Sequence, residues 1–85
     1  MDISRAEQRI LHLLAQGGWI EHTHSSNAKI SEVRCFTRDG WAYSGLDIVL
    51  FRKLKRLKAI TSSGGRPYRI TTRGLQLVRS QPDNR

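Results

Sequence analysis

The stretch GLDIVLFRKLKRLKAITSSGGRPYRITTRGLQLVR, residues 45–79, decides the fold of this 85-residue chain. It predicts a basic helix, a hairpin of two short strands joined by a glycine turn, and a closing helix. The stretch holds nine of the fifteen Lys and Arg residues and a single acid, Asp47, which gives it a net charge of +8. Residues 1–44 carry five basic and five acidic residues and sum to zero, so the excess charge lies on this one module.

The basic helix is predicted to be amphipathic. Ser44 is its expected N-cap, and Asp47 follows near the positive end of the helix dipole. Leucines recur at helical spacing with Val49 beside them, and this side is expected to face the core: Leu46, Leu50, Leu54 and Leu57.

The opposite side of the same helix is cationic, with Arg52, Lys55 and Arg56. Ile48 falls among these cations. One interpretation is that Ile48 belongs to a surface that contacts a partner. The other is that the helix is tilted, which leaves Ile48 half-buried.

The rest of the module completes a hairpin and a helix. Residues 59–61 and 68–70 are predicted as paired strands, with the sequence SSGGRP between them. Thr71 is the expected N-cap of the last helix, whose apolar side is Leu75, Leu77 and Val78. Residues 80–85 are expected to form a frayed tail.

The chain before this module predicts one helix and a small sheet. A capping box at Ser4-Arg5-Ala6-Glu7 starts a helix that runs to about Gln16 and ends at Gly17-Gly18. Its expected apolar stripe is Ala6, Ile10, Leu13 and Leu14. Residues 19–24 and 30–37 alternate like strands on either side of a turn at 25–29. Asp39-Gly40 then predicts a tight turn into residues 41–43, so the middle of the chain is an antiparallel meander of two to three strands.

These elements predict an α+β fold in a single domain, residues 1–85. The order of basic helix, hairpin and Thr-x-x-Gly helix resembles a winged-helix domain with a meander added between the first and second helices. In such a domain the basic helix enters the major groove, and the hairpin loop, or wing, reaches an adjacent phosphate or the minor groove. The candidate partner- or DNA-binding residues are then Ile48, Arg52, Lys53, Lys55, Arg56, Lys58 and the wing residue Arg66. The meander takes the place of the short helix that normally precedes a recognition helix, which argues against sequence-specific reading.

Composition limits the class of protein. A pI near 10.9 indicates an acidic partner, either nucleic acid or an acidic protein surface. No apolar run reaches the ~20 residues that a membrane span needs, and the polar N-terminus shows no signal region. The single cysteine, Cys35, fits a reducing compartment. We therefore expect a cytoplasmic protein without a membrane partner.

Catalytic and metal-binding patterns are weak. His22 and His24 share one face of a predicted strand, and His12 and Cys35 could join them at a metal ion, but the spacing is unlike that of structural zinc sites. Cys35 lies on the expected core face, as a small apolar residue rather than a nucleophile. Gly64-Gly65 lacks the Lys-Ser/Thr of a phosphate-binding loop. We expect no enzyme, no cofactor and no metal.

The large aromatic residues of the meander are Trp19, Trp41 and Tyr43. We interpret them as a lid between sheet and helices. Stacking on single-stranded bases is the alternative.

Short motifs spread over nearly the whole chain resemble the YjhX family of small bacterial proteins, the topoisomerase I toxin-inhibitors. They are SRAEQ at residues 4–8, Leu11-His12 with Leu14-Ala15, VRCFTRDG at 33–40, FRKLK at 51–55, GRPYRI at 65–70, VRSQ at 78–81 and DNR at 83–85. The resemblance implies a toxin that binds DNA topoisomerase I and blocks its action on DNA, with an acetyltransferase-like antitoxin as its partner. Duplex DNA is a further candidate partner. The alternative function is a winged-helix transcriptional regulator that binds DNA through the same face.

Overall fold

A computed structural model describes residues 3–24 and 29–79 of the chain. The described residues form three helices and two small antiparallel sheets, which agrees with the predicted α+β class, whereas the winged-helix assignment stays a prediction. The elements are α1 (Arg5–Ala15), β1 (Trp19–His24), β2 (Ile30–Phe36), β3 (Ala42–Tyr43), α2 (Ile48–Arg56), β4 (Ile60–Thr61), β5 (Arg69–Ile70) and α3 (Thr72–Arg79). Most of the turn predicted at 25–29 and the predicted tail at 80–85 lie outside the described residues.

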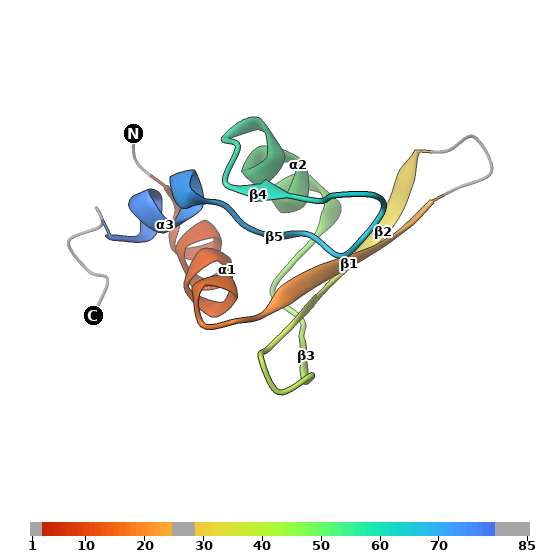
Figure 1. Cartoon of the computed structure of the whole chain (residues 1–85), viewed down its shortest axis with the longest axis horizontal. Helices are drawn as coiled ribbons and strands as arrows, with labels where there is room; N and C mark the ends of the chain where they lie inside the picture. The colour runs from red at the N-terminus through yellow and green to blue at the C-terminus, as the bar shows by residue number, and fades with distance from the viewer. Residues whose placement is uncertain (1–2, 25–28, 80–85) are drawn as a thin grey trace.

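The two sheets lie side by side and are joined by one bridge. The first has the strand order β1-β2-β3 and is the predicted meander, whereas the second is the β4–β5 hairpin. Ile20 of β1 and Tyr68, just before β5, exchange two backbone hydrogen bonds of 3.0 and 2.8 Å. In Figure 1, α1 and α3 lie together at one end of the molecule, and the β1–β2 ribbon extends toward the other end.

One apolar core connects the helices to both sheets. It is formed by Ile3, Ile10, Leu11, Leu14, Ile20, Cys35, Phe51, Leu54, Ala59, Ile60, Leu77 and Val78. Alternation along the strands explains which residues enter it, since Ile20 and Cys35 are cross-strand partners and both are buried. The predicted placement of Cys35 in the core is therefore confirmed.

The buried face of α1 is rotated from the predicted one. Leu11 is fully buried and Ala6 is exposed, so the stripe drawn through Ala6 was wrong at that position. Leu13 is half-buried against the core. The helix turns toward Glu7 and Leu11, and the buried Glu7 carboxylate meets Lys53 of α2 there.

The start of α2 also differs from the prediction. Asp47 is the N-cap, and its carboxylate accepts a hydrogen bond of 2.8 Å from the amide of Leu50. Ser44 and Gly45 instead form a turn in which Gly45 packs against the ring of Tyr43, where a Cβ would collide. The predicted cap at Ser44 was wrong, because Ser44 lies in this turn and the helix starts only after the extended residue Asp47.

The three large aromatic residues of the meander do not act as one lid. Trp19 and Tyr43 are half-buried, and the Trp19 ring stacks on that of Phe36 with centroids 5.6 Å apart. Trp41 is 73% exposed, so the lid interpretation was wrong for this residue. Trp41 follows the Asp39-Gly40 turn at the tip of a hairpin, beyond the reach of the core.

The Thr71-x-x-Gly74 motif fixes the last helix against the basic module. The Thr71 hydroxyl accepts a hydrogen bond of 3.0 Å from the Gly74 amide, which confirms Thr71 as the N-cap of α3. The same hydroxyl donates to the carbonyl of Lys58 at 2.7 Å. Gly74 lies so close to the carbonyl of Ala59 that a Cβ would collide with it. Glycine is therefore required here for packing.

We predict that Gly74→Ala lowers the free energy of unfolding by about 2 kcal/mol, because the added methyl group forces α3 away from Ala59. Thermal denaturation followed by circular dichroism would show a midpoint about 10 °C lower. Arg73→Ala is the matched control, since Arg73 is the exposed neighbour of Gly74. Equal stability of the two variants would contradict the role of the close approach.

Candidate interaction surface on α2 and the β4–β5 loop

The orientation of α2 is set by two residues that enter the core. Phe51 and Leu54 are fully buried, and the leucines predicted at Leu46, Leu50 and Leu57 are half-buried around them. Phe51 was missed because a stripe of four leucines fits helical spacing without it. Its burial turns the helix by a fraction of a turn relative to the predicted orientation.

This rotation decides which residues face solvent. Arg52 and Arg56 are exposed as predicted, and Val49, which is 69% exposed, lies on the same face one turn before Arg52. Val49 was predicted to flank the core, which is wrong. Ile48 is half-buried and packs against the core, so the second interpretation of Ile48 is the one the structure supports. We call Val49, Arg52 and Arg56 the outer face of α2.

Lys55 lies at the flank of α2 and reaches the hairpin. Its Nζ is 5.7 Å from the ring centroids of both Phe51 and Tyr68. These two rings meet edge to face at 5.0 Å. A cation over two aromatic faces stabilises their packing, so Lys55 holds the start of β5 against α2 as well as carrying charge at the surface.

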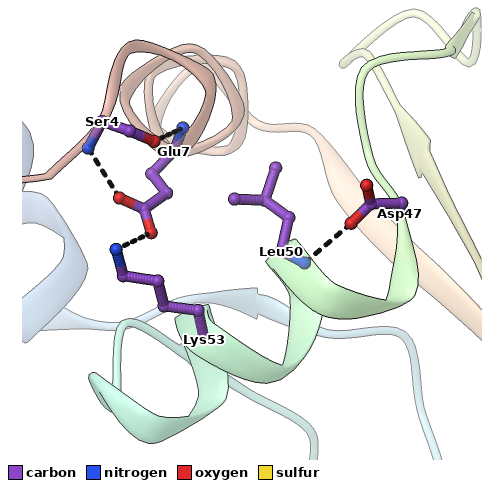
Figure 2. A network of polar contacts seen from close by, with 5 residues as sticks. All are labelled: Ser4, Glu7, Asp47, Leu50 and Lys53. Atoms are coloured by element: carbon purple, nitrogen blue, oxygen red, sulfur yellow. Dashed lines mark hydrogen bonds and ion pairs between the residues drawn. The ribbon is translucent and has the colours of Figure 1, made fainter.

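The Lys53 side chain is 44% exposed, but it extends from α2 to a buried acceptor on α1. Its Nζ forms an ion pair of 2.8 Å with the Glu7 carboxylate, whose side chain is 1% exposed (Figure 2). The other oxygen of Glu7 accepts a hydrogen bond of 2.6 Å from the Ser4 amide, which completes the predicted capping box. Lys53 therefore links α2 to the start of α1, a role that the sequence did not reveal.

The environment of Glu7 shifts its titration. Burial alone would raise the pKa of Glu7, but the Lys53 ammonium and the hydrogen bonds from Ser4 outweigh it and hold the pKa below its ordinary value of 4.5. A carboxyl group whose pKa is lower in the folded state stabilises the fold above its ordinary pKa. That stabilisation is lost as the pH falls through the folded-state pKa.

Lys58 and Arg66 lie at the two ends of the hairpin. Lys58 follows α2 in the left-handed backbone conformation, with φ at 59°, and its side chain is exposed. Arg66 is exposed in the β4–β5 loop, residues 62–68. Arg66 lines a groove together with Trp19, Glu21, Thr61, Ser63, Pro67 and Arg69, and no residue of α2 contributes to that groove. The structure thus separates the outer face of α2 from the surface around Arg66.

The histidines and Cys35 do not gather at one site. In the described part of the chain, no three His, Cys, Asp or Glu side chains lie close enough to hold a metal ion. The His22 ring packs edge to face on Tyr68, with centroids 5.0 Å apart, and on His24 at 5.2 Å. Burial raises the pKa of the Cys35 thiol to about 11, which leaves it protonated and weakly nucleophilic at neutral pH. Among the described residues, no helix is both long and apolar enough to cross a lipid bilayer.

We predict that Glu7→Gln lowers the free energy of unfolding at pH 7 by about 2 kcal/mol, since the amide keeps the volume but not the charged contacts. The difference from the wild type should be constant above about pH 5 and shrink as the solution is acidified below pH 4. Urea denaturation at a series of pH values measures it. Glu32→Gln, an exposed site on β2, is the matched control. A pH-independent difference would show that Glu7 does not act through its charge.

Comparison with known proteins finds relatives along the whole chain. The family model described as "putative toxin of bacterial toxin-antitoxin pair" matches residues 1–85. The UPF0386 protein of Rhizobium etli strain CFN 42 is 73% identical over 85 residues, all of both chains. That of Hyphomonas neptunium is 67% identical over 84 residues, 99% of each chain. That of Agrobacterium fabrum is 66% identical over the full 85 residues. No solved structure matches the chain.

The match over residues 1–85 confirms the resemblance that the short motifs indicate. It also confirms that an antitoxin belongs to the biology of these proteins, since the family is defined as one member of a toxin–antitoxin pair. The chain belongs to the YjhX family of toxins from bacterial toxin–antitoxin pairs.

Proposed function

We propose that this protein is a toxin that binds DNA topoisomerase I and blocks its action on DNA without catalysing a reaction. Membership of a toxin family supports the proposal that the protein is a toxin. The proposal that it binds the enzyme rests on the outer face of α2, where Arg52 and Arg56 share one side of the helix with an exposed Val49. Binding through such a face needs no catalytic residues, because the inhibitor acts by occupying a surface.

The chemistry of the outer face favours a particular mode of inhibition. A groove that binds DNA is itself positively charged, so two arginines gain little by entering it when it is empty. They gain more from phosphates that are already bound at the edge of the enzyme. Val49 adds an apolar contact, which suits a protein surface better than a phosphate backbone. The protein is therefore proposed to hold the complex of topoisomerase I and DNA.

The partner that neutralises the toxin is proposed to be an acetyltransferase-like antitoxin. Such a partner would suppress toxicity by covering the same outer face. Adding the purified antitoxin to an assay of plasmid relaxation by topoisomerase I tests this partner, because the antitoxin should restore relaxation.

A DNA-binding regulator is the alternative function. It is favoured by the placement of α2 before a β4–β5 hairpin with a glycine-rich loop, the arrangement of a recognition helix and a wing. The three-stranded sheet stands between α1 and α2, where a DNA-reading winged helix carries a short helix. On this alternative, duplex binding would weaken steeply with salt and retain a sequence preference at high salt.

Relaxation of supercoiled plasmid by purified topoisomerase I separates the two functions. The protein is titrated at several enzyme and several DNA concentrations. Inhibition that follows the enzyme concentration and is unchanged by extra DNA supports direct inhibition of the enzyme. Inhibition that disappears as DNA is added means that the protein coats DNA, and the regulator function replaces the toxin function.

We predict that Arg52→Glu combined with Arg56→Glu raises the concentration needed for half-inhibition by more than about tenfold, because both cations of the outer face are reversed. Lys55 is left unchanged, since its contacts with Phe51 and Tyr68 support the fold. Arg9→Glu with Arg73→Glu makes the same charge change at exposed positions on α1 and α3. Equal loss of inhibition in both double variants would mean that net charge acts, rather than the outer face.

A further inference from the structure

The groove beside Arg66 is a second candidate site, on the side of the joined sheets that faces away from the core. Its volume is about 650 Å³, within the roughly 300–1,000 Å³ typical of sites for small ligands. Trp19 and Glu21 alternate along β1 with the buried Ile20. Thr61, which also lines the groove, is exposed next to the buried Ile60 of β4. The groove therefore exists because the Ile20–Tyr68 bridge brings β1 beside the hairpin.

The aromatic wall of the groove is held in place. The Trp19 ring stacks on the Phe36 ring at a centroid distance of 5.6 Å and an angle of 20°. The indole Nε1 donates a hydrogen bond of 3.1 Å to the Glu21 carboxylate. Phe36 covers one face of the indole and fixes the tilt of the ring, and the hydrogen bond to Glu21 fixes the position of its Nε1 edge. A ring held in this way is a ready platform for a second planar group.

The charge of the groove favours an anion next to this platform. Arg66 and Arg69 both line it, against the single carboxylate of Glu21, which already accepts from the indole. Arg69 Nη1 donates to the carbonyls of Gly17 and Gly18 at 3.2 and 3.5 Å, so its guanidinium is positioned before any ligand arrives. Arg66 lies on the exposed loop and is available for contact. An arginine pair beside an aromatic face matches a phosphate that carries a planar base.

We propose that this groove binds an unpaired nucleotide of single-stranded DNA, with the base stacked on Trp19 and the phosphate held by Arg66 and Arg69. In a duplex the faces of each base are covered by its neighbours, so only an unpaired base can lie against the indole. Pro67, opposite Glu21 in the register set by the Ile20–Tyr68 bridge, closes the apolar side of the groove. The choice of DNA over RNA rests on the proposed function, which places the protein at an enzyme that acts on DNA.

The test uses the isolated protein and a fluorescein-labelled oligothymidylate of about eight nucleotides, with anisotropy as the readout. In a Trp41→Phe background, quenching of the remaining tryptophan reports directly on Trp19. Arg66→Ala is expected to weaken binding about fivefold, and Trp19→Ala about tenfold, whereas Trp19→Phe keeps most of the affinity. Arg9→Ala, which removes an exposed arginine from α1 outside both proposed surfaces, is the matched control and should change binding less than about twofold.

Each of the following four results would overturn the proposal. Equal weakening by Arg66→Ala and Arg9→Ala would mean diffuse attraction between charges. Tighter binding of the same sequence as a duplex would exclude stacking on Trp19, and equal competition by polyglutamate would make the groove a site for acidic peptides. Tighter binding of oligouridylate would reassign the site to RNA. Topoisomerase I is absent from the anisotropy assay. A negative result for the groove is therefore distinguishable from a negative result in the plasmid relaxation test. Because Arg66 lies on an exposed loop, its variant tests the site even where Trp19→Ala does not fold.

Discussion

Two backbone hydrogen bonds between Ile20 and Tyr68 hold the halves of this small protein in register. Without them, the two-stranded basic hairpin would be a separate sheet, too small to be stable alone. The bridge sets the position of Tyr68, which in turn meets Phe51 of α2 and the ammonium of Lys55. It also sets Arg69 against the turn that follows α1. The positions of the outer face of α2 and of the groove beside Arg66 thus both depend on the peptide groups of Ile20 and Tyr68.

The sequence predicts much of the local structure because capping boxes, glycine turns and strand alternation depend on neighbouring residues. The helix that begins after Ser4, the hairpin that ends at Ile70 and the cap at Thr71 all follow from such patterns. The bridge between Ile20 and Tyr68 joins residues far apart in the chain, and no local pattern indicates it. The groove beside Trp19 was unpredictable for the same reason.

The helix orientations show where periodicity reaches its limit. Four leucines on α2 fit one face so well that Phe51 was overlooked, yet the larger ring takes the centre of the core. A shift of this size exchanges the roles of Ile48 and Val49, which differ by one position in the chain. Lys53 was likewise assigned to a partner because its buried acceptor, Glu7, lies on another helix. Arg52 and Arg56 were correctly predicted to be exposed. They lie far from the predicted leucine face and also far from the face that the structure buries.

The ion pair between Glu7 and Lys53 has a consequence for the variation of this family. A buried carboxylate without its cation is costly, and so is a cap whose acid has been removed, so neither position is free to change alone. Relatives that replace Lys53 with an apolar residue should also replace Glu7, although the two positions are 46 residues apart. The pair therefore constrains substitutions in α1 and α2 jointly, and it does so independently of the protein's targets.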